Sequence, residues 1–200
     1  MSRQYSDIDI RYLFVLAGFC CVKQGPVFCF IVDKAYLRGQ NKVMSKYKVI
    51  YMDVEALGMV DMTNGGVVSL KPDVDIIKAI MNTNPVCVLL ICNTPVKDTE
   101  ELDTLMAMSV DAVKRKCKVA CFGCYAIDNV DENKSLPNTF IKETFEKGIV
   151  NAGVKIEEQD NAVVGGDLFK EFAENCGIEN YMTVEQFKSK DYAIQEEVNG

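Results

Sequence analysis

The sequence contains no histidine among its 200 residues. A Ser-His-Asp triad, a Cys-His dyad and an imidazole metal ligand are therefore excluded. Any acid–base chemistry must come from carboxylates, lysines, tyrosines or thiols. This absence alone removes most of the familiar hydrolase mechanisms.

An excess of basic residues is also missing. The 22 Lys and Arg residues are outnumbered by 29 Asp and Glu residues, which gives a formal net charge of −7. This charge disfavours non-specific binding to nucleic acid, which depends on neutralising phosphates. Residues 34–48 are a local exception, with cations at Lys34, Arg38, Lys42, Lys46 and Lys48. This stretch could meet a polyanion, but a solvated connector is the simpler interpretation.

No apolar run has the length of a transmembrane helix. The longest, Leu13–Val22, has about half of the ~20 residues that such a helix needs. Asp7 and Asp9 precede this run, where a signal peptide would carry positive charge. The 9 cysteines lie mostly in apolar runs, which favours buried thiols in a reducing compartment over a disulfide framework. We therefore expect a cytoplasmic or nuclear protein with no membrane partner.

Strands and helices alternate along the chain from residue 47 onward. The pattern predicts strands at 47–53, 85–92, 118–124, 161–164 and 181–182, and helices at 73–81, 98–116, 138–151, 168–175 and after the capping box that begins at Thr183. We interpret Pro72 as a first-turn proline and Gly177 as a helix stop. Alternation of this kind predicts an α/β fold, a three-layer Rossmann-like parallel sheet with helices on both faces.

The same pattern divides the chain into three parts. Residues 47–192 form the α/β domain, and residues 193–200 a C-terminal tail. Residues 1–46 contain two apolar, β-prone runs and are expected to form a β-rich N-terminal extension.

The cysteines at 117, 121 and 124 have a spacing that invites a zinc hypothesis. They fall at the predicted strand 118–124, whose period of two turns Cys121 and Cys124 to opposite faces. Structural thiols are therefore the preferred interpretation.

Polar residues follow the predicted strands at their carboxyl ends, where an open parallel sheet binds its ligands. They are Asp53, Glu55, Asn93, Thr94, Asp167 and Glu171, with Asp128, Asp131, Glu132 and Lys134 in the loop after the third strand. Carboxylates from separate strand ends could hold Mg²⁺. An aspartate beside that metal could attack phosphorus while a second carboxylate shuttles the proton. This chemistry needs no histidine.

The C-terminal stretch Asn161–Phe187 carries a family resemblance. An apolar strand ends in Gly166-Asp167, Glu171 follows four residues later, and a helix, a Gly-Ile pair and a last strand complete the pattern. This order resembles the last motif of phosphatases of the haloacid dehalogenase (HAD) type.

Two upstream stretches are similar to the other motifs of that family. Val49–Glu55 resembles the first, Asp-x-Asp after an apolar strand, and Val86–Thr94 resembles the second, a strand ending in Thr/Ser-Asn. Lys134 falls where the family has its lysine. Over about residues 47–192, the order is nearest to polynucleotide kinase 3′-phosphatases and to the histidinol-phosphatase-like branch.

The resemblance implies an HAD-like fold and Mg²⁺-dependent hydrolysis of phosphomonoesters through an aspartyl-phosphate. It assigns Asp53 as nucleophile and Glu55 as acid/base. The remaining roles are phosphate binding by Asn93, Thr94 and Lys134, and metal binding by Asp53, Asp167 and Glu171. The implied substrate is a small phosphoester or a nucleic-acid 3′ phosphate.

Four positions depart from the family pattern. Glu55 replaces the second Asp, and its extra methylene moves the carboxylate by roughly an ångström. Ala56 stands for Gly and Leu57 for Thr. Cys92 stands for Thr or Ser if Asn93 is matched to the family's Asn; otherwise Thr94 supplies the hydroxyl. The alternative is therefore a catalytically inactive HAD-like domain, a binding or structural module with a protein partner at residues 1–46. A generic flavodoxin-like or von Willebrand-type fold is a third possibility, for which no metal or flavin-phosphate motif is visible.

Simpler interpretations stand beside the catalytic ones for single residues. Asp53 could instead be a turn or cap residue, and Asp167 could be the N-cap of the following helix. Lys134 could be one more solvated charge in a polar loop.

Overall fold

The computed structural model describes residues 46–63, 67–92, 99–125 and 138–189. The elements in chain order are β1 (Val49–Asp53), the 3₁₀ turn η2 (Val54–Leu57), β2 (Gly58–Thr63), β3 (Val67–Pro72), α2 (Val74–Thr83), β4 (Cys87–Cys92), α3 (Thr99–Cys117), β5 (Ala120–Tyr125), α4 (Asn138–Asn151), the 3₁₀ turn η3 (Glu158–Asp160), β6 (Asn161–Val164), α5 (Asp167–Cys176), β7 (Tyr181–Met182) and α6 (Val184–Ser189). The expected N-terminal extension lies outside the described residues except for Lys46, and the tail lies outside them entirely.

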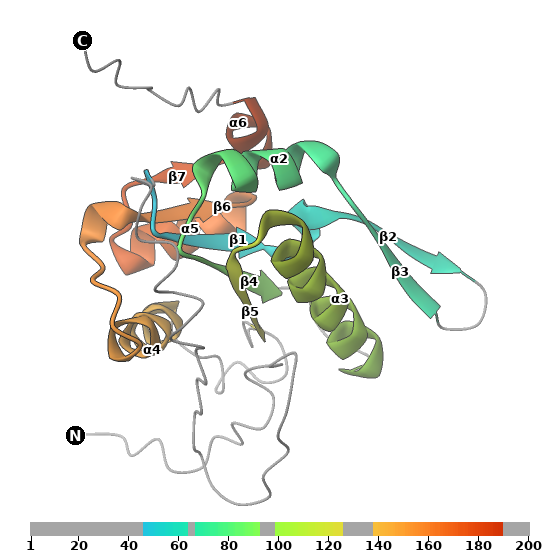
Figure 1. Ribbon diagram of the computed structural model, residues 1–200, viewed down its shortest axis with the longest axis horizontal. Helices are drawn as coiled ribbons and strands as arrows, with labels where there is room; N and C mark the ends of the chain where they lie inside the picture. Colours follow the sequence, from blue (N-terminus) through green and yellow to red (C-terminus); the bar gives the residue numbers. More distant parts are fainter. Residues whose placement is uncertain (1–45, 64–66, 93–98, 126–137, 190–200) are drawn as a thin grey trace, which may run out of the picture.

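A five-stranded sheet forms the centre of the described structure, in the order β5-β4-β1-β6-β7. Every pairing is parallel, and β1 lies in the middle between β4 and β6 (Figure 1). The predicted parallel sheet is confirmed. Because parallel strands end at the same edge, Asp53 lies at the centre of the carboxyl edge.

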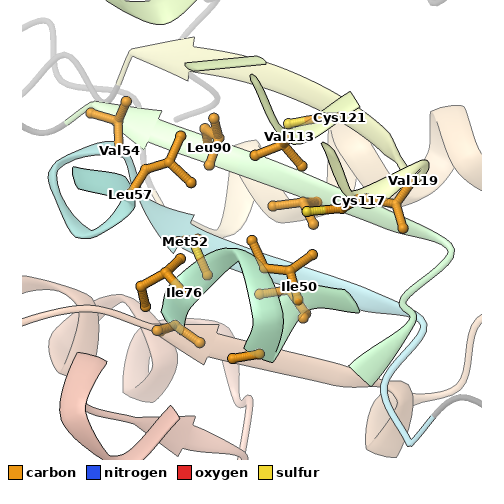
Figure 2. Packing of buried hydrophobic residues seen from close by; sticks show 14 of the residues in the cluster. Ile50, Met52, Val54, Leu57, Ile76, Leu90, Val113, Cys117, Val119 and Cys121 are labelled. Carbon is orange, nitrogen blue, oxygen red and sulfur yellow. The ribbon is translucent and has the colours of Figure 1, made fainter. Parts of the chain in front are cut away.

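Helices cover both faces of the sheet, which confirms the three-layer α/β architecture. Alternate residues of β1 face opposite ways: Ile50 and Met52 pack with α2, α3 and α6, whereas Tyr51 packs with α4 and α5. Figure 2 shows the first of these clusters, where Ile76 and Val113 meet the sheet. Full burial of each large aliphatic side chain contributes about 1.5–3 kcal/mol.

The face covered by α4 and α5 is rich in aromatic rings. Tyr51 lies between Phe145 and Phe172, at ring-centroid distances of 6.0 and 5.6 Å. Phe122 of β5 contacts Phe145 edge-on at 5.6 Å. Edge-on and tilted contacts of this kind add to the stabilisation from burial.

An antiparallel hairpin of β2 and β3 follows η2 and extends away from the sheet past α3 (Figure 1). The sequence analysis assigned no element to these residues, and it was wrong about Pro72. Pro72 ends β3, where it pairs with Gly58, and helix α2 begins two residues later behind Asp73. A side chain at Gly58 would place its Cβ 2.2 Å from the Lys71 carbonyl oxygen, so glycine is required for the two strands to close here.

The six cysteines that the structure describes form no disulfide with one another. Cys117 and Cys121 pack in the cluster on the α2/α3 face, and Cys124 packs in the opposite cluster. This confirms that Cys121 and Cys124 point to opposite faces, so the three thiols do not converge on one metal. Within the described ranges, no helix is both long enough and apolar enough to span a membrane.

Candidate active site

Asp53 is the last residue of the central strand, and its half-buried carboxylate caps η2. The backbone N–H of Glu55 donates a hydrogen bond to Asp53 Oδ1 at 3.0 Å. Burial raises the pKa of Asp53 to about 6, because a carboxylate withdrawn from water favours its neutral form. The Glu55 N–H opposes this rise, and the Glu55 charge adds to it. A central carboxylate with a perturbed pKa is a candidate functional group.

Glu55 lies two residues further on, in η2, and its side chain is exposed. It lines the same hollow as Asp53. Leu57, at the end of the same turn, is fully buried and packs with Val54 and Leu90 in the first core cluster (Figure 2). The short turn therefore exposes the Glu55 carboxylate, while the buried side chains of Val54 and Leu57 anchor it in the core.

The turn after β6 brings a second carboxylate to the same edge of the sheet. Met52 pairs with Val164, the last residue of β6, so Asp53 and Gly165 come next on two neighbouring strands at the same edge. Asp167 is the first residue of α5 and is exposed. The N-cap interpretation of Asp167 is wrong, because Gly166 occupies the N-cap position.

Two features hold this turn in place. A Cβ on Gly165 would lie 2.5 Å from Phe169 Cγ, so the absence of a side chain lets the Phe169 ring lie against the backbone. Tyr181 Oη donates to the carbonyl oxygens of Gly165 at 3.0 Å and Gly166 at 3.3 Å. Burial and the nearby Asp167 carboxylate raise the pKa of Tyr181, which keeps this donor protonated. This role of Tyr181 in holding the turn was not predicted, because a single tyrosine in a strand forms no sequence pattern that indicates it.

The other residues predicted for the site divide into two groups. Asn93, Thr94 and Lys134 lie outside the described residues, as do Asp128, Asp131 and Glu132. Glu171 is described, and it is exposed one turn beyond Asp167 on α5. Over the described ranges, no three Asp, Glu or Cys side chains converge in an arrangement that could hold a metal ion. Among the described residues of the predicted set, the structure thus brings Asp53, Glu55 and Asp167 to one edge of the sheet.

An open hollow of about 610 Å³ lies beside Asp53, between η2, the base of the hairpin, the start of α2 and α6. Its lining consists of Asp53, Glu55, Ala56, Gly58, Lys71, Pro72, Asp73, Val74, Val184 and Lys188. The sequence analysis predicted the first two of these residues as functional and missed Lys71 and Lys188, which come from elements it did not place together.

Two residues in the lining of this hollow, Asp73 and Lys188, form an ion pair. Lys188 Nζ lies 2.8 Å from Asp73 Oδ2 and 3.0 Å from Glu185 Oε1. Asp73 is also the N-cap of α2, accepting hydrogen bonds from the N–H groups of Asp75 and Ile76. The bond from Lys188 and these N–H groups lower the pKa of Asp73. The pair therefore ties α6 to the start of α2 with a carboxylate that stays ionised.

The predicted capping box supports α6 at its first turn. Thr183 Oγ1 accepts from the Gln186 N–H at 3.2 Å, and Gln186 Oε1 accepts from the Thr183 N–H at 3.0 Å. Phe187 is fully buried and anchors the helix in the core. These contacts confirm the capping signal and position Lys188 at the hollow.

Comparisons with known proteins leave the family of this chain open. No model of a known protein family matches it, and no curated protein matches it. A solved structure that does match is that of a hypothetical protein from Xanthomonas campestris, 10% identical with a TM-score of 0.42 over 81% of this chain and 74% of that one. A likeness this distant carries no argument, so the function is argued from the site.

Proposed function

We propose that this protein is an HAD-like phosphatase that hydrolyses phosphomonoesters with Mg²⁺, through an aspartyl-phosphate on Asp53. The observation that carries the proposal is the position of Asp53. It ends the central strand of a parallel sheet, half-buried and with a raised pKa, beside strand β6, which is followed by the turn Gly165-Gly166 and by Asp167. This is the arrangement that the resemblance to the HAD motifs requires.

The donors at this edge suit Mg²⁺. Magnesium is commonly bound through one or two carboxylates, with waters completing its shell. Asp53 ends β1 and Asp167 follows the adjacent parallel strand β6, so these two can supply the carboxylates; Glu171, one turn behind Asp167, does not converge with them in the described structure. When bound, Mg²⁺ supplies charge neutralisation for phosphoryl oxygens as a Lewis acid.

The side chains then have distinct tasks. The Glu55 N–H holds Asp53 Oδ1, which leaves Oδ2 to attack phosphorus. The bond from Asp53 to phosphorus forms as the bond from phosphorus to the substrate alcohol breaks, and protonated Glu55 gives its proton to the departing oxygen. Glu55 then takes a proton from water, which attacks phosphorus and releases inorganic phosphate and the Asp53 carboxylate.

A second candidate is a catalytically inactive HAD-like module. Leu57 favours it, since an apolar side chain fully buried in the core stands where the family has threonine. The longer Glu55 side chain favours it as well, because displacement of an acid/base group lowers rates steeply. Under this alternative the fold and the hollow remain, and phosphate release is absent.

The deciding experiment measures phosphate release from an aryl phosphate with and without Mg²⁺, for the wild-type protein and for Asp53→Asn. We expect release to need Mg²⁺ and to fall at least about 1000-fold in the variant, because the nucleophile is lost. The matched control is Asp75→Asn, an exposed carboxylate on α2 that pairs with Lys78 outside the hollow. This control should keep wild-type activity.

Thermal unfolding provides a readout that does not depend on the substrate. Mg²⁺ should raise the melting temperature of the wild-type protein and not that of Asp53→Asn. If neither phosphate release nor Mg²⁺-induced stabilisation is observed, the enzyme proposal is wrong and the inactive module remains.

A further inference from the structure

We infer that the hollow beside Asp53 accepts a phosphomonoester whose alcohol portion carries a second anionic group, and that Lys71 binds this group. The inference rests on the proposed function and names the class of its substrate. Lys71 would act as a specificity residue that touches the leaving group, away from the reacting phosphate.

The size of the hollow is the first observation. Its volume of about 610 Å³ lies within the range of about 300–1,000 Å³ that is typical of sites for whole small molecules. Its lining includes Asp53 and Glu55 and the apolar residues Pro72, Val74 and Val184. A substrate bound with its phosphate at Asp53 therefore has room for an alcohol portion against these apolar side chains.

The charges of the lining are the second observation. The charge of Lys188 is neutralised by two carboxylates, those of Asp73 at 2.8 Å and Glu185 at 3.0 Å. Lys71 is exposed, and within the described ranges it forms no ion pair. Two of the N-terminal N–H groups of α2, those of Asp75 and Ile76, are already occupied by the Asp73 side chain. The cation of the lining that remains available to an anion is therefore Lys71.

The backbone that carries Lys71 is held firmly to the turn that carries Glu55. Lys71 pairs with Met59 in the hairpin, one residue beyond the close approach at Gly58. The N–H of Asp73 donates to the Leu57 carbonyl oxygen at 2.7 Å, which closes the chain after Pro72 onto η2. These two ties keep the spacing between Lys71 and the Asp53 end of β1 constant, as recognition of two anionic groups in one molecule requires.

Two matched substrate pairs test the inference. 3-Phosphoglycerate has a carboxylate where glycerol 3-phosphate has a hydroxymethyl group, and a thymidine dinucleotide ending in a 3′-phosphate adds a phosphodiester and a second thymidine to thymidine 3′-phosphate. We expect the wild-type protein to prefer the second member of at least one pair by 10-fold or more in kcat/KM. Preference in the first pair identifies a small organic acid, and preference in the second identifies a nucleic-acid end.

Lys71→Met should lower kcat/KM for the member that carries the second anion by about 10-fold or more and so abolish that preference, and Lys71→Arg should keep it. Lys78→Met, which removes an exposed lysine from α2 outside the hollow, is the matched control and should leave the preference intact. A wild-type protein with no preference in either pair, or a preference that survives in Lys71→Met, overturns the inference.

Calorimetric titration with 3-phosphoglycerate and with the phosphorylated dinucleotide separates this inference from the proposed function. If phosphate release is absent but at least one of these anions binds and loses its binding in Lys71→Met, the anion site stands in an inactive domain and the enzyme proposal fails alone. If phosphate is released but binding and preference do not depend on Lys71, the enzyme proposal stands and the inference about Lys71 fails.

Discussion

The carboxylates at the two edges of the central sheet have different bonding partners. At the amino edge, Asp160 lies 2.7 Å from Lys48 Nζ and also accepts the Glu157 N–H at 2.8 Å. At the carboxyl edge, the hydrogen bond that Asp53 accepts among the described residues comes from the Glu55 N–H, and burial raises its pKa to about 6. Asp160 thus has a cation partner within the described structure and Asp53 has a backbone donor.

We interpret Asp160 as a structural charge and Asp53 as a candidate functional charge. A carboxylate whose cation and donors come from the fold stabilises the fold and needs no ligand to balance its charge. A carboxylate that is partly desolvated without a cation destabilises the fold slightly, and a bound metal or substrate can supply what is missing. The contrast predicts that substitutions at the two edges affect different properties.

The largest stability effect is expected at the carboxyl edge, from Gly165→Ala. The new Cβ would lie 2.5 Å from Phe169 Cγ, so the ring and the start of α5 must move. We expect a loss of about 1–3 kcal/mol in the free energy of unfolding, measured by urea titration. Since Asp167 begins α5, the stabilisation by Mg²⁺ should decrease too.

The control for that variant is Gly166→Ser, because a Cβ on Gly166 meets no atom within 4 Å and serine suits its N-cap position. Its stability should equal or exceed that of the wild-type protein. Equal stability of Gly165→Ala and Gly166→Ser would show that the close contact with Phe169 does not hold the turn.

At the amino edge, Asp160→Ala should reduce stability and leave phosphate release unchanged per folded molecule. The variant leaves Lys48 and the Glu157 N–H to water, which costs about 0.5–1.5 kcal/mol because both groups are partly exposed. Glu158→Ala, which removes an exposed carboxylate from the same 3₁₀ turn, should have little effect on unfolding. If Asp160→Ala lost more activity than its loss of folded protein explains, the distinction between a structural amino edge and a functional carboxyl edge would be wrong.

The smallest effect is a change in pH dependence in Asp53→Asn, measured without metal. A carboxylate whose pKa is near 6 in the folded state and near 3.8 when exposed binds more protons folded than unfolded between these values. Its contribution to stability is therefore present below about pH 4 and is lost as the pH rises through 6.

Asparagine imitates the protonated form, so Asp53→Asn should become more stable than the wild-type protein above pH 6. The gain should be on the order of 1 kcal/mol, allowing for the partial exposure of the carboxylate to water. Chemical unfolding at pH 4 and pH 8 in the presence of a chelator measures it. A gain that is equal at both pH values would contradict a raised pKa at Asp53.

The alternation of strands and helices in the sequence was sufficient to predict the three-layer sheet. Every strand of that sheet was predicted, because buried parallel strands such as Cys87–Cys92 are unbroken apolar runs. The hairpin Gly58–Pro72 was missed, since its two strands lie between the first predicted strand and helix and neither is a long apolar run. The Asn64-Gly65 pair between them is a hairpin signal that could have revealed it.

The site was predictable only in part, for a related reason. Asp53, Glu55 and Asp167 were identified because the ends of parallel strands are read directly from the sequence. Lys71 and Lys188 lie 117 positions apart and come from a hairpin and the last helix of the described structure. No local pattern predicts that they line one hollow.

The sequence by itself determined which chemistry is possible and which architecture carries it. The absence of histidine restricted catalysis to carboxylates, lysines, tyrosines and thiols, and the periodicity of apolar residues specified a parallel sheet between helices. Only the tertiary structure decided which charges are compensated. The pairing of Lys188 with Asp73 and of Lys48 with Asp160 depends on packing between distant elements, and the partial burial of Asp53 depends on the layers closing around its strand.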